Sequence, residues 1–216
     1  MSKGKGKSKP AKAARKKAKA KPGPKKQAKT RAAGPKRLPG DPSRAEMIRR
    51  MLRVNQAGEY GAVRIYEGQL AVLGETESAP AIREMAEQER RHLAAFNKLI
   101  PEHRVRPTAL LPVWHVAGFA LGAGTALLGE KAAMACTVAV EEVIDEHYAG
   151  QVRALEREGG AEDAALRDIF EQFRLEEVEH KEVSLELGAR EAPALGPLTA
   201  LVKAGSRLAI WLSTRI

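Results

Sequence analysis

The stretch FRLEEVEHKEV, residues 173–183, places Glu177 and His180 three positions apart in a helical pattern. Residues three apart share one face of an α-helix, so both side chains point the same way. That face carries Leu166, Phe170, Phe173, Glu177, His180 and Ser184. Because an apolar stripe turns toward a core, the pattern predicts a carboxylate and an imidazole inside a bundle of helices.

A second stretch, EQERRHL at residues 87–93, repeats this arrangement with Glu89 and His92. The stripe around them holds Ile82, Met85 and Phe96. Two other predicted helices each bring one carboxylate, Glu59 and Glu141, to an apolar stripe. The order Glu, Glu-x-x-His, Glu, Glu-x-x-His therefore indicates a duplicated helical hairpin.

Four carboxylates that converge in a core cannot stay there as unpaired charges. Taking one ionised carboxylate out of water costs several kcal/mol. Two divalent or trivalent metal ions would offset this cost, and four carboxylates with two imidazoles form the di-iron or di-manganese site of helical bundles. The opposing interpretation is that these are surface glutamates and polar histidines on loosely amphipathic helices.

Helical signals continue along the chain from Ser43. Ser43 and Glu46 form a capping box, and helices are predicted over about 43–74, 78–101, 131–158 and 162–187, followed by a final amphipathic segment. No alternating strand pattern competes with them. The predicted fold is all-α, a four-helix bundle with one or two apolar additions.

Two glycines fall inside the first predicted helix. Gly58 and Gly61 each cost about 1 kcal/mol relative to alanine in a helix interior. We therefore expect another backbone or a ligand to come close to them.

The apolar addition LLPVWHVAGFALGAGTALLG spans residues 110–129 and contains no Asp, Glu, Lys or Arg. Its length alone would suffice to cross a bilayer. It also contains Pro112, His115 and four glycines. We expect a short apolar helix or hairpin that lies in the membrane interface.

Charge divides the chain of 216 residues into two parts. Residues 1–44 hold 17 of the 37 Lys and Arg residues and one acid, Asp41, whereas the remainder holds 20 bases and 26 acids. Residues 1–42 are predicted to form a disordered basic arm, and residues 43–216 to form the folded domain. The arm could bind nucleic acid or an anionic membrane, or simply increase solubility. The single cysteine, Cys136, excludes an internal disulfide and a cysteine-based metal site.

Five motifs resemble those of the demethoxyubiquinone hydroxylases of coenzyme Q biosynthesis, and the resemblance extends over about residues 43–216. The motifs are NQAGEYGAVRIYEGQ, QERRHLAAFN, RVRPTALLPVWHVAGFALGAGTALLG, ACTVAVEEVIDEHY and RLEEVEHKE. The resemblance implies a ferritin-like fold and an O₂-dependent di-iron monooxygenase. Its substrate would be a polyprenylated demethoxyubiquinol, whose ring is hydroxylated from 3-demethoxyubiquinol to 3-demethylubiquinol.

The resemblance also implies the residues of the site. Six residues match the ligands of two Fe²⁺ ions, with Glu89 and Glu177 bridging: Glu59, Glu89, His92, Glu141, Glu177 and His180. His147 and Tyr148 match a pair beside the metal that orients a ligand or relays electrons. Either NADH or the quinol would supply the electrons.

The resemblance places the enzyme peripherally on the inner membrane, at its cytoplasmic side. Its apolar segments would reach the isoprenoid substrate, and a lipid-binding protein of the same pathway would assist. A homo-oligomer stays open, and nucleic acid is not an expected partner. The alternative function is a ferritin-like protein for iron storage or peroxide scavenging. The apolar flanks and the lack of a four-cysteine site argue against it.

Overall fold

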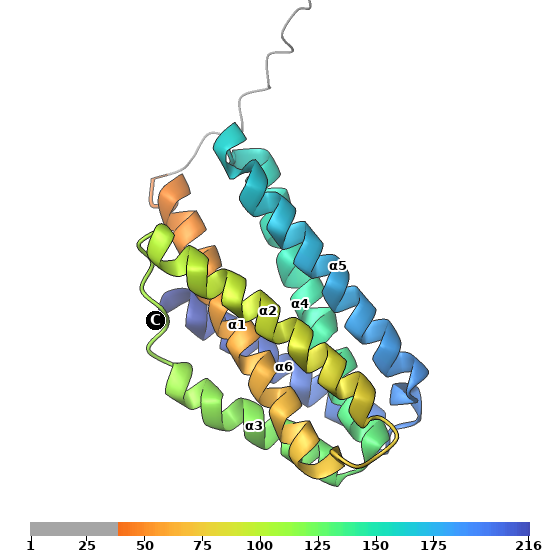
Figure 1. The fold of residues 1–216 in the computed structure, drawn as a ribbon. Helices are drawn as coiled ribbons and strands as arrows, with labels where there is room; N and C mark the ends of the chain where they lie inside the picture. The colour runs from red at the N-terminus through yellow and green to blue at the C-terminus, as the bar shows by residue number, and fades with distance from the viewer. Residues whose placement is uncertain (1–38) are drawn as a thin grey trace, which may run out of the picture. The chain divides into compact units, whose positions relative to one another are not determined.

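A computed structural model describes residues 39–216, and no strand occurs among them. Its helices are α1 (Arg44–Leu73), α2 (Ala79–Glu102), α3 (Leu111–Leu127), α4 (Glu130–Glu158), α5 (Ala164–Glu186) and α6 (Leu195–Arg215) (Figure 1). Short 3₁₀ turns, Ala161–Asp163 and Ala189–Glu191, precede α5 and α6. The prediction of an all-α fold is confirmed. The predicted basic arm lies outside the described residues except for residues 39–42.

Four of these helices form the predicted bundle. α1 packs against α2, α4 packs against α5, and the two pairs meet through α1 with α4 and α2 with α5 (Figure 1). The loop between α1 and α2 is short, and α4 and α5 are joined by a short 3₁₀ turn, so each pair is a helical hairpin. The bundle with two added helices agrees with the predicted ferritin-like architecture.

The bundle core has two apolar layers. One layer combines residues near the start of α1 and α5 with the ends of α2 and α4, and includes Leu52, Phe96 and Phe170. The other combines the opposite ends of these helices, and includes Ile82 and Met134. All five side chains are fully buried. On each of the four helices, one glutamate falls in residue number between the residues of the two layers. The carboxylates therefore lie in the middle of the core, and they belong to Glu59, Glu89, Glu141 and Glu177.

The apolar segment forms one helix, α3, which settles the choice between a helix and a hairpin. α3 packs along α1, and α6 packs against α4 and α1. Trp114 on α3 donates a hydrogen bond from Nε1 to Ser213 Oγ on α6 at 2.9 Å. Across residues 39–216, no helix combines the length and the hydropathy that crossing a membrane requires.

Close packing of α1 and α3 depends on glycine. A Cβ atom at Gly68 would lie 2.2 Å from the Phe119 carbonyl oxygen, and one at Gly122 would lie 1.9 Å from the Ile65 carbonyl oxygen. The expected backbone approach also occurs at Gly61, because a Cβ at Gly118 would lie 2.9 Å from the Gly61 carbonyl oxygen. A Cβ at Gly58 or at Gly61 would itself meet no atom within 4 Å.

Helix ends follow the predicted signals with two differences. Ser43 accepts a hydrogen bond from the Glu46 amide at 3.2 Å, while the Glu46 carboxylate accepts from Arg49 and Arg50. Pro101, the last residue of the predicted second helix, lies inside α2, which ends at Glu102. Arg104, two residues beyond this end, has a left-handed φ of 51°. Such a residue reverses the chain, and backbone hydrogen bonds then close the last turn.

Candidate metal centre

Six polar side chains meet in the middle of the bundle, one or two from each of its helices. α1 supplies Glu59, α2 supplies Glu89 and His92, α4 supplies Glu141, and α5 supplies Glu177 and His180. None of the six is more than 4% exposed. The structure therefore brings together every residue that the sequence indicated as a metal ligand.

These residues form two overlapping groups of four. Ligand atoms of Glu59, Glu89, His92 and Glu177 lie within 4.8 Å of one another, as do those of Glu89, Glu141, Glu177 and His180. Glu89 and Glu177 belong to both groups. Two shared carboxylates between two groups suit a pair of adjacent ions, because a carboxylate can offer one oxygen to each.

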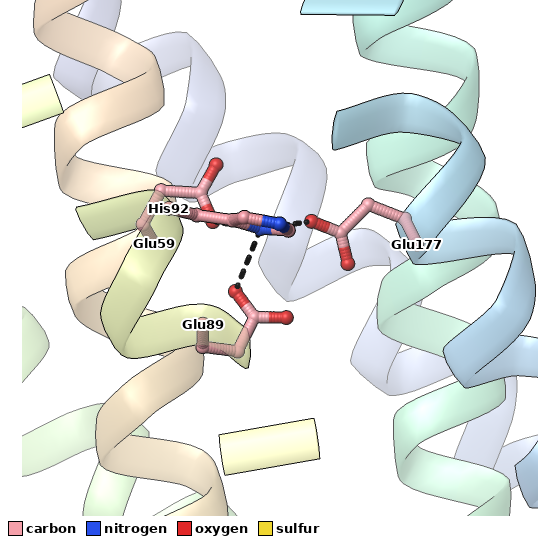
Figure 2. Close-up of side chains that lie close together, drawn as sticks. All are labelled: Glu59, Glu89, His92 and Glu177. Atoms are coloured by element: carbon pink, nitrogen blue, oxygen red, sulfur yellow. Dashed lines mark ion pairs between the residues drawn. The ribbon is translucent and has the colours of Figure 1, made fainter. Parts of the chain in front are cut away.

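Both imidazoles turn the same ring nitrogen to the centre. Nδ1 of His180 lies 3.1 Å from Glu89 and 3.2 Å from Glu177, and Nδ1 of His92 lies 3.3 Å from Glu177. Figure 2 shows the carboxylates of Glu89 and Glu177 directed at the ring of His92, with Glu59 beside it. Each group of four thus combines one imidazole with three carboxylates, and their ligand atoms lie within 4.8 Å of one another.

The buried charges lack hydrogen-bond donors that would satisfy them. Both carboxylate oxygens of Glu89 and Glu177 have no hydrogen-bond partner, nor does either ring nitrogen of His180. Burial, and then the charge of Glu177, raises the pKa of Glu89 well above its ordinary value. Burial likewise raises the pKa of Glu141. Cations between the carboxylates would remove this cost, so the donor set fits two metal ions.

Glu59 and Glu141, the carboxylates that belong to only one group each, are both contacted by a tyrosine from the opposite hairpin. Tyr66 on α1 donates a hydrogen bond to Glu141 at 3.1 Å, and Tyr148 on α4 donates one to Glu59. Burial raises the pKa of both phenols, so both remain donors. Each tyrosine stands seven positions after the glutamate of its own helix, a repeat that links the two halves of the chain.

A seventh carboxylate supports one imidazole from outside. Nε2 of His92 lies 2.6 Å from Glu176, and the ring stacks on Phe173 with centroids 4.0 Å apart. A hydrogen bond to the second nitrogen fixes the orientation of a metal-binding imidazole. Sequence reasoning missed Glu176, because a charged residue beside a buried one normally marks the solvent-facing side of a helix.

His147 belongs to a polar group one turn away from the carboxylates. The amides of Asn55 and Gln151 pair with each other at 2.7 and 2.8 Å, and His147 Nε2 lies 2.8 Å from the Gln151 amide nitrogen. The same ring nitrogen lies 3.1 Å from Asn55 Oδ1, so it contacts both amides of the pair. Burial lowers the pKa of His147 to about 4, which agrees with a neutral ring. Of the predicted pair, Tyr148 therefore touches a proposed ligand, whereas His147 contacts Asn55 and Gln151.

Comparison with known proteins agrees with this geometry. A family model described as ubiquinone biosynthesis protein COQ7 matches residues 46–213. The chain belongs to this family. The resemblance that the motifs indicated is thereby confirmed.

Several relatives in the COQ7 family are closely similar. The 3-demethoxyubiquinol 3-hydroxylase of Rhodospirillum rubrum is 57% identical over 181 residues, which cover 83% of this chain and 84% of the relative. The NADPH-dependent 3-demethoxyubiquinone 3-hydroxylase, mitochondrial, of Homo sapiens is 52% identical over 169 residues, or 78% of each chain. The 5-demethoxyubiquinone hydroxylase, mitochondrial, of Saccharomyces cerevisiae is 40% identical over 187 residues, covering 81% and 80%.

Two cavities adjoin the cluster in this member of the COQ7 family. A small one of about 30 Å³ is lined by Glu59, Glu89, Glu141 and Glu177, together with Asn55, His147 and Tyr148. A larger one of about 430 Å³ lies between α1, α3, α4 and α6 and is lined mainly by apolar residues. Its volume falls in the range of about 300–1,000 Å³ typical of small-molecule sites. The apolar site thus lies next to the carboxylates.

Proposed function

We propose that this protein hydroxylates the ring of a polyprenylated demethoxyubiquinol, using O₂ and two iron ions held in the bundle. The observation that carries this proposal is the convergence of four carboxylates and two imidazoles in two buried groups that share Glu89 and Glu177. The names of the relatives, which include a 3-demethoxyubiquinol 3-hydroxylase, favour hydroxylation over iron storage or peroxide scavenging.

The side chains divide into three roles in this proposal. Glu59 and His92 would hold one ion, Glu141 and His180 would hold the other, and Glu89 and Glu177, which belong to both groups, would be shared between them. Bound iron would supply the one-electron chemistry and O₂ activation that amino-acid side chains lack.

The surrounding residues keep the site in one arrangement and free of bulk water. Tyr66 and Tyr148 hold the outer carboxylates by hydrogen bonds, which leaves fewer orientations for each. Apolar layers at both ends of the cluster exclude solvent along the bundle axis. The larger cavity offers mainly apolar walls to an isoprenoid tail, and the indole N–H of Trp114 is already bound to Ser213 Oγ.

We further propose that the enzyme binds peripherally to the inner membrane at its cytoplasmic side. A substrate with an isoprenoid tail stays in lipid, so the enzyme has to meet the bilayer with an apolar surface. Exposed apolar side chains on α3 and α6 support this role: Val113, Val116, Phe119, Leu127, Leu201, Leu208 and Trp211. A lipid-binding partner and self-association remain predictions.

A reduced nicotinamide is our proposed source of electrons. The name of the human relative includes NADPH dependence, which favours a nicotinamide over the quinol. Stopped-flow reduction of the ferric protein under argon, with NADPH, NADH and a quinol compared, tests this choice. Reduction by the quinol alone would reverse it.

The function is tested with a demethoxyubiquinol that has a short isoprenoid tail. Iron content is measured first, and product is then quantified by mass spectrometry under ¹⁸O₂. We expect two iron ions per chain and one ¹⁸O atom in each product molecule. Rapid ferrous oxidation and mineral formation without ring hydroxylation would instead support the iron-storage alternative.

A further inference from the structure

The two cavities share a set of apolar residues, which we call the neck. The neck consists of Val54, Gly58 and Ala62 on α1, Val140 and Ile144 on α4, and Ile210 on α6. All six residues line both the small cavity beside the carboxylates and the large apolar cavity. A molecule that binds in the large cavity therefore reaches the carboxylates across these residues.

Gly58 stands at the centre of the α1 part of the neck. Val54, Gly58 and Ala62 are one helical turn apart and share one face. A Cβ atom built on Gly58 meets no atom within 4 Å. The residue also has ordinary helical backbone, since it is absent from the positive-φ glycines. Neither close packing nor backbone conformation thus requires glycine here, unlike at Gly68 and Gly122.

The volumes of the two cavities determine where a ring can lie when it approaches the carboxylates. The small cavity, at about 30 Å³, has room for about one water molecule and not for a six-membered ring. The large cavity, at about 430 Å³, can hold a small organic molecule. A ring that approaches the carboxylates must therefore occupy the neck itself, where every atom added to residue 58 removes space.

We propose that Gly58 is a specificity-determining residue whose bare Cα forms the passage for the ring of the quinol. This inference rests on the proposed function, and it adds where the ring lies and what limits its size. The ring occupies the neck, while the isoprenoid tail stays between α3 and α6 in the large cavity. A side chain at position 58 takes the place of the ring and leaves the part of the large cavity around Trp114 open to the tail.

Steady-state kinetics of a size series test this proposal. Gly58→Ala, Gly58→Val and Gly58→Leu are compared for hydroxylation of the short-tailed demethoxyubiquinol. We expect kcat/KM to fall stepwise, by at least 100-fold in Gly58→Leu, with iron content and helicity unchanged. Gly124→Leu is the matched control, because Gly124 is exposed on α3, has no atom within 4 Å of its Cβ position and lines neither cavity.

A binding measurement separates the two sides of the neck without relying on turnover. Trp114 lines only the large cavity and His147 only the small one. In zinc-loaded protein, the NMR signals of both rings are followed during titration with a decyl-tailed demethoxyquinone. We expect ligand-induced shifts at both rings in the unmodified protein and in Gly58→Ala. In Gly58→Leu, we expect a shift at Trp114 alone.

The outcomes distinguish this inference from the proposed function. An unmodified protein that neither hydroxylates the quinol nor shows a shift at either ring contradicts the proposed function. If the unmodified protein does both, and Gly58→Leu also hydroxylates with equal kcat/KM and shifts His147 equally, the role of Gly58 is wrong and the function stands.

Discussion

Glu177 and His180 are the residues on which the proposed metal centre depends most directly. Glu177 belongs to both ligand groups, and His180 Nδ1 faces Glu89 and Glu177. We expect Glu177→Ala and His180→Ala each to reduce bound iron from two ions per chain to less than one. Helicity should persist, because the apolar layers on both sides of the cluster hold the helices together. Elemental analysis and circular dichroism measure both quantities.

The matched control for these variants is Glu179→Ala, because Glu179 lies between them on α5 and is exposed. This control should keep both iron ions. Full iron occupancy in either Glu177→Ala or His180→Ala would refute the ligand assignment.

Glu176 is a positioning residue for His92 in this interpretation. Its carboxylate lies 2.6 Å from His92 Nε2, on the side of the ring away from the cluster. Loss of such an outer partner typically weakens metal binding about 10- to 100-fold. We expect that range for Glu176→Ala, measured by competition with a chelator, and partial recovery in Glu176→Gln. Equal weakening in Glu179→Ala would show a general effect of charge instead.

His147 gives the protein a predictable response to acid. Burial lowers the pKa of His147 to about 4 in the folded protein, from an ordinary value of 6.5. Between these values the unfolded chain binds the proton and the folded one does not, so stability falls as pH falls from 6.5 to 4. This difference between the two pKa values corresponds to a change of roughly 3 kcal/mol in the free energy of unfolding. Urea unfolding across that range should give a shallower dependence of stability on pH in His147→Gln than in the unmodified protein.

The sequence was sufficient to indicate the six proposed ligands, because each interrupts an apolar stripe that the bundle buries. It was not sufficient for contacts between helices. Glu176 bonds to His92, 84 positions earlier, and no periodicity within one helix reports that neighbour. Tyr66 and Tyr148 were visible beside their own glutamates, but their hydrogen bonds go to the glutamate of the other hairpin.

At the scale of the helix, glycines have two different uses that the sequence alone does not separate. Gly68 and Gly122 allow the backbones of α1 and α3 to touch. Gly58 and Gly61 have free space at their Cβ positions and line the large cavity. Helix propensity penalises all four equally, so only the packing of α3 on α1 shows which glycines the fold requires.

Alanine substitutions should separate these two uses by opposite effects on stability. Gly61→Ala should stabilise the protein by about 1 kcal/mol, because alanine favours the helix and meets no atom. Gly122→Ala should destabilise it by about 1–3 kcal/mol, because its Cβ would lie 1.9 Å from the Ile65 carbonyl oxygen. Thermal unfolding by calorimetry should show Tm moving up in the first variant and down in the second. Equal shifts in both would contradict the packing described here.

At the scale of the whole domain, the two hairpins contribute equivalent residues to the proposed metal centre. α1 with α2 and α4 with α5 each contribute one glutamate, one Glu-x-x-His pair and one tyrosine seven positions after the first glutamate. The equivalence is incomplete at the residue before the second glutamate. Gln88 stands there in the first hairpin and Glu176 in the second, and the two side chains bond to each other at 2.9 Å. The two metal positions are therefore expected to differ, with His92 more firmly oriented than His180.

The domain also carries apolar surface on α3 and α6, the two helices outside the bundle. Val116 is 66% exposed and Trp211 is 52% exposed, and neither lines the small or the large cavity described above. We expect Val116→Asp and Trp211→Asp each to weaken binding to anionic lipid vesicles at least tenfold, because each loses about 1.4 kcal/mol or more of apolar burial. Vesicle flotation measures the bound fraction.

The controls decide whether α3 and α6, the basic arm or general hydrophobicity holds the protein on vesicles. Leu175 on α5 is 56% exposed, and Leu175→Asp should bind like the unmodified protein if α3 and α6 face the lipid. Deletion of residues 1–42 removes 16 bases and one acid, which changes the formal net charge from +10 to −5. Any contribution of the arm should vanish in this variant and at high salt, whereas apolar binding should persist. Hydroxylation of the short-tailed quinol should survive this deletion, because the six proposed ligands and both cavities lie within residues 54–213. Equal loss of vesicle binding in Leu175→Asp and Val116→Asp would contradict a membrane role for α3.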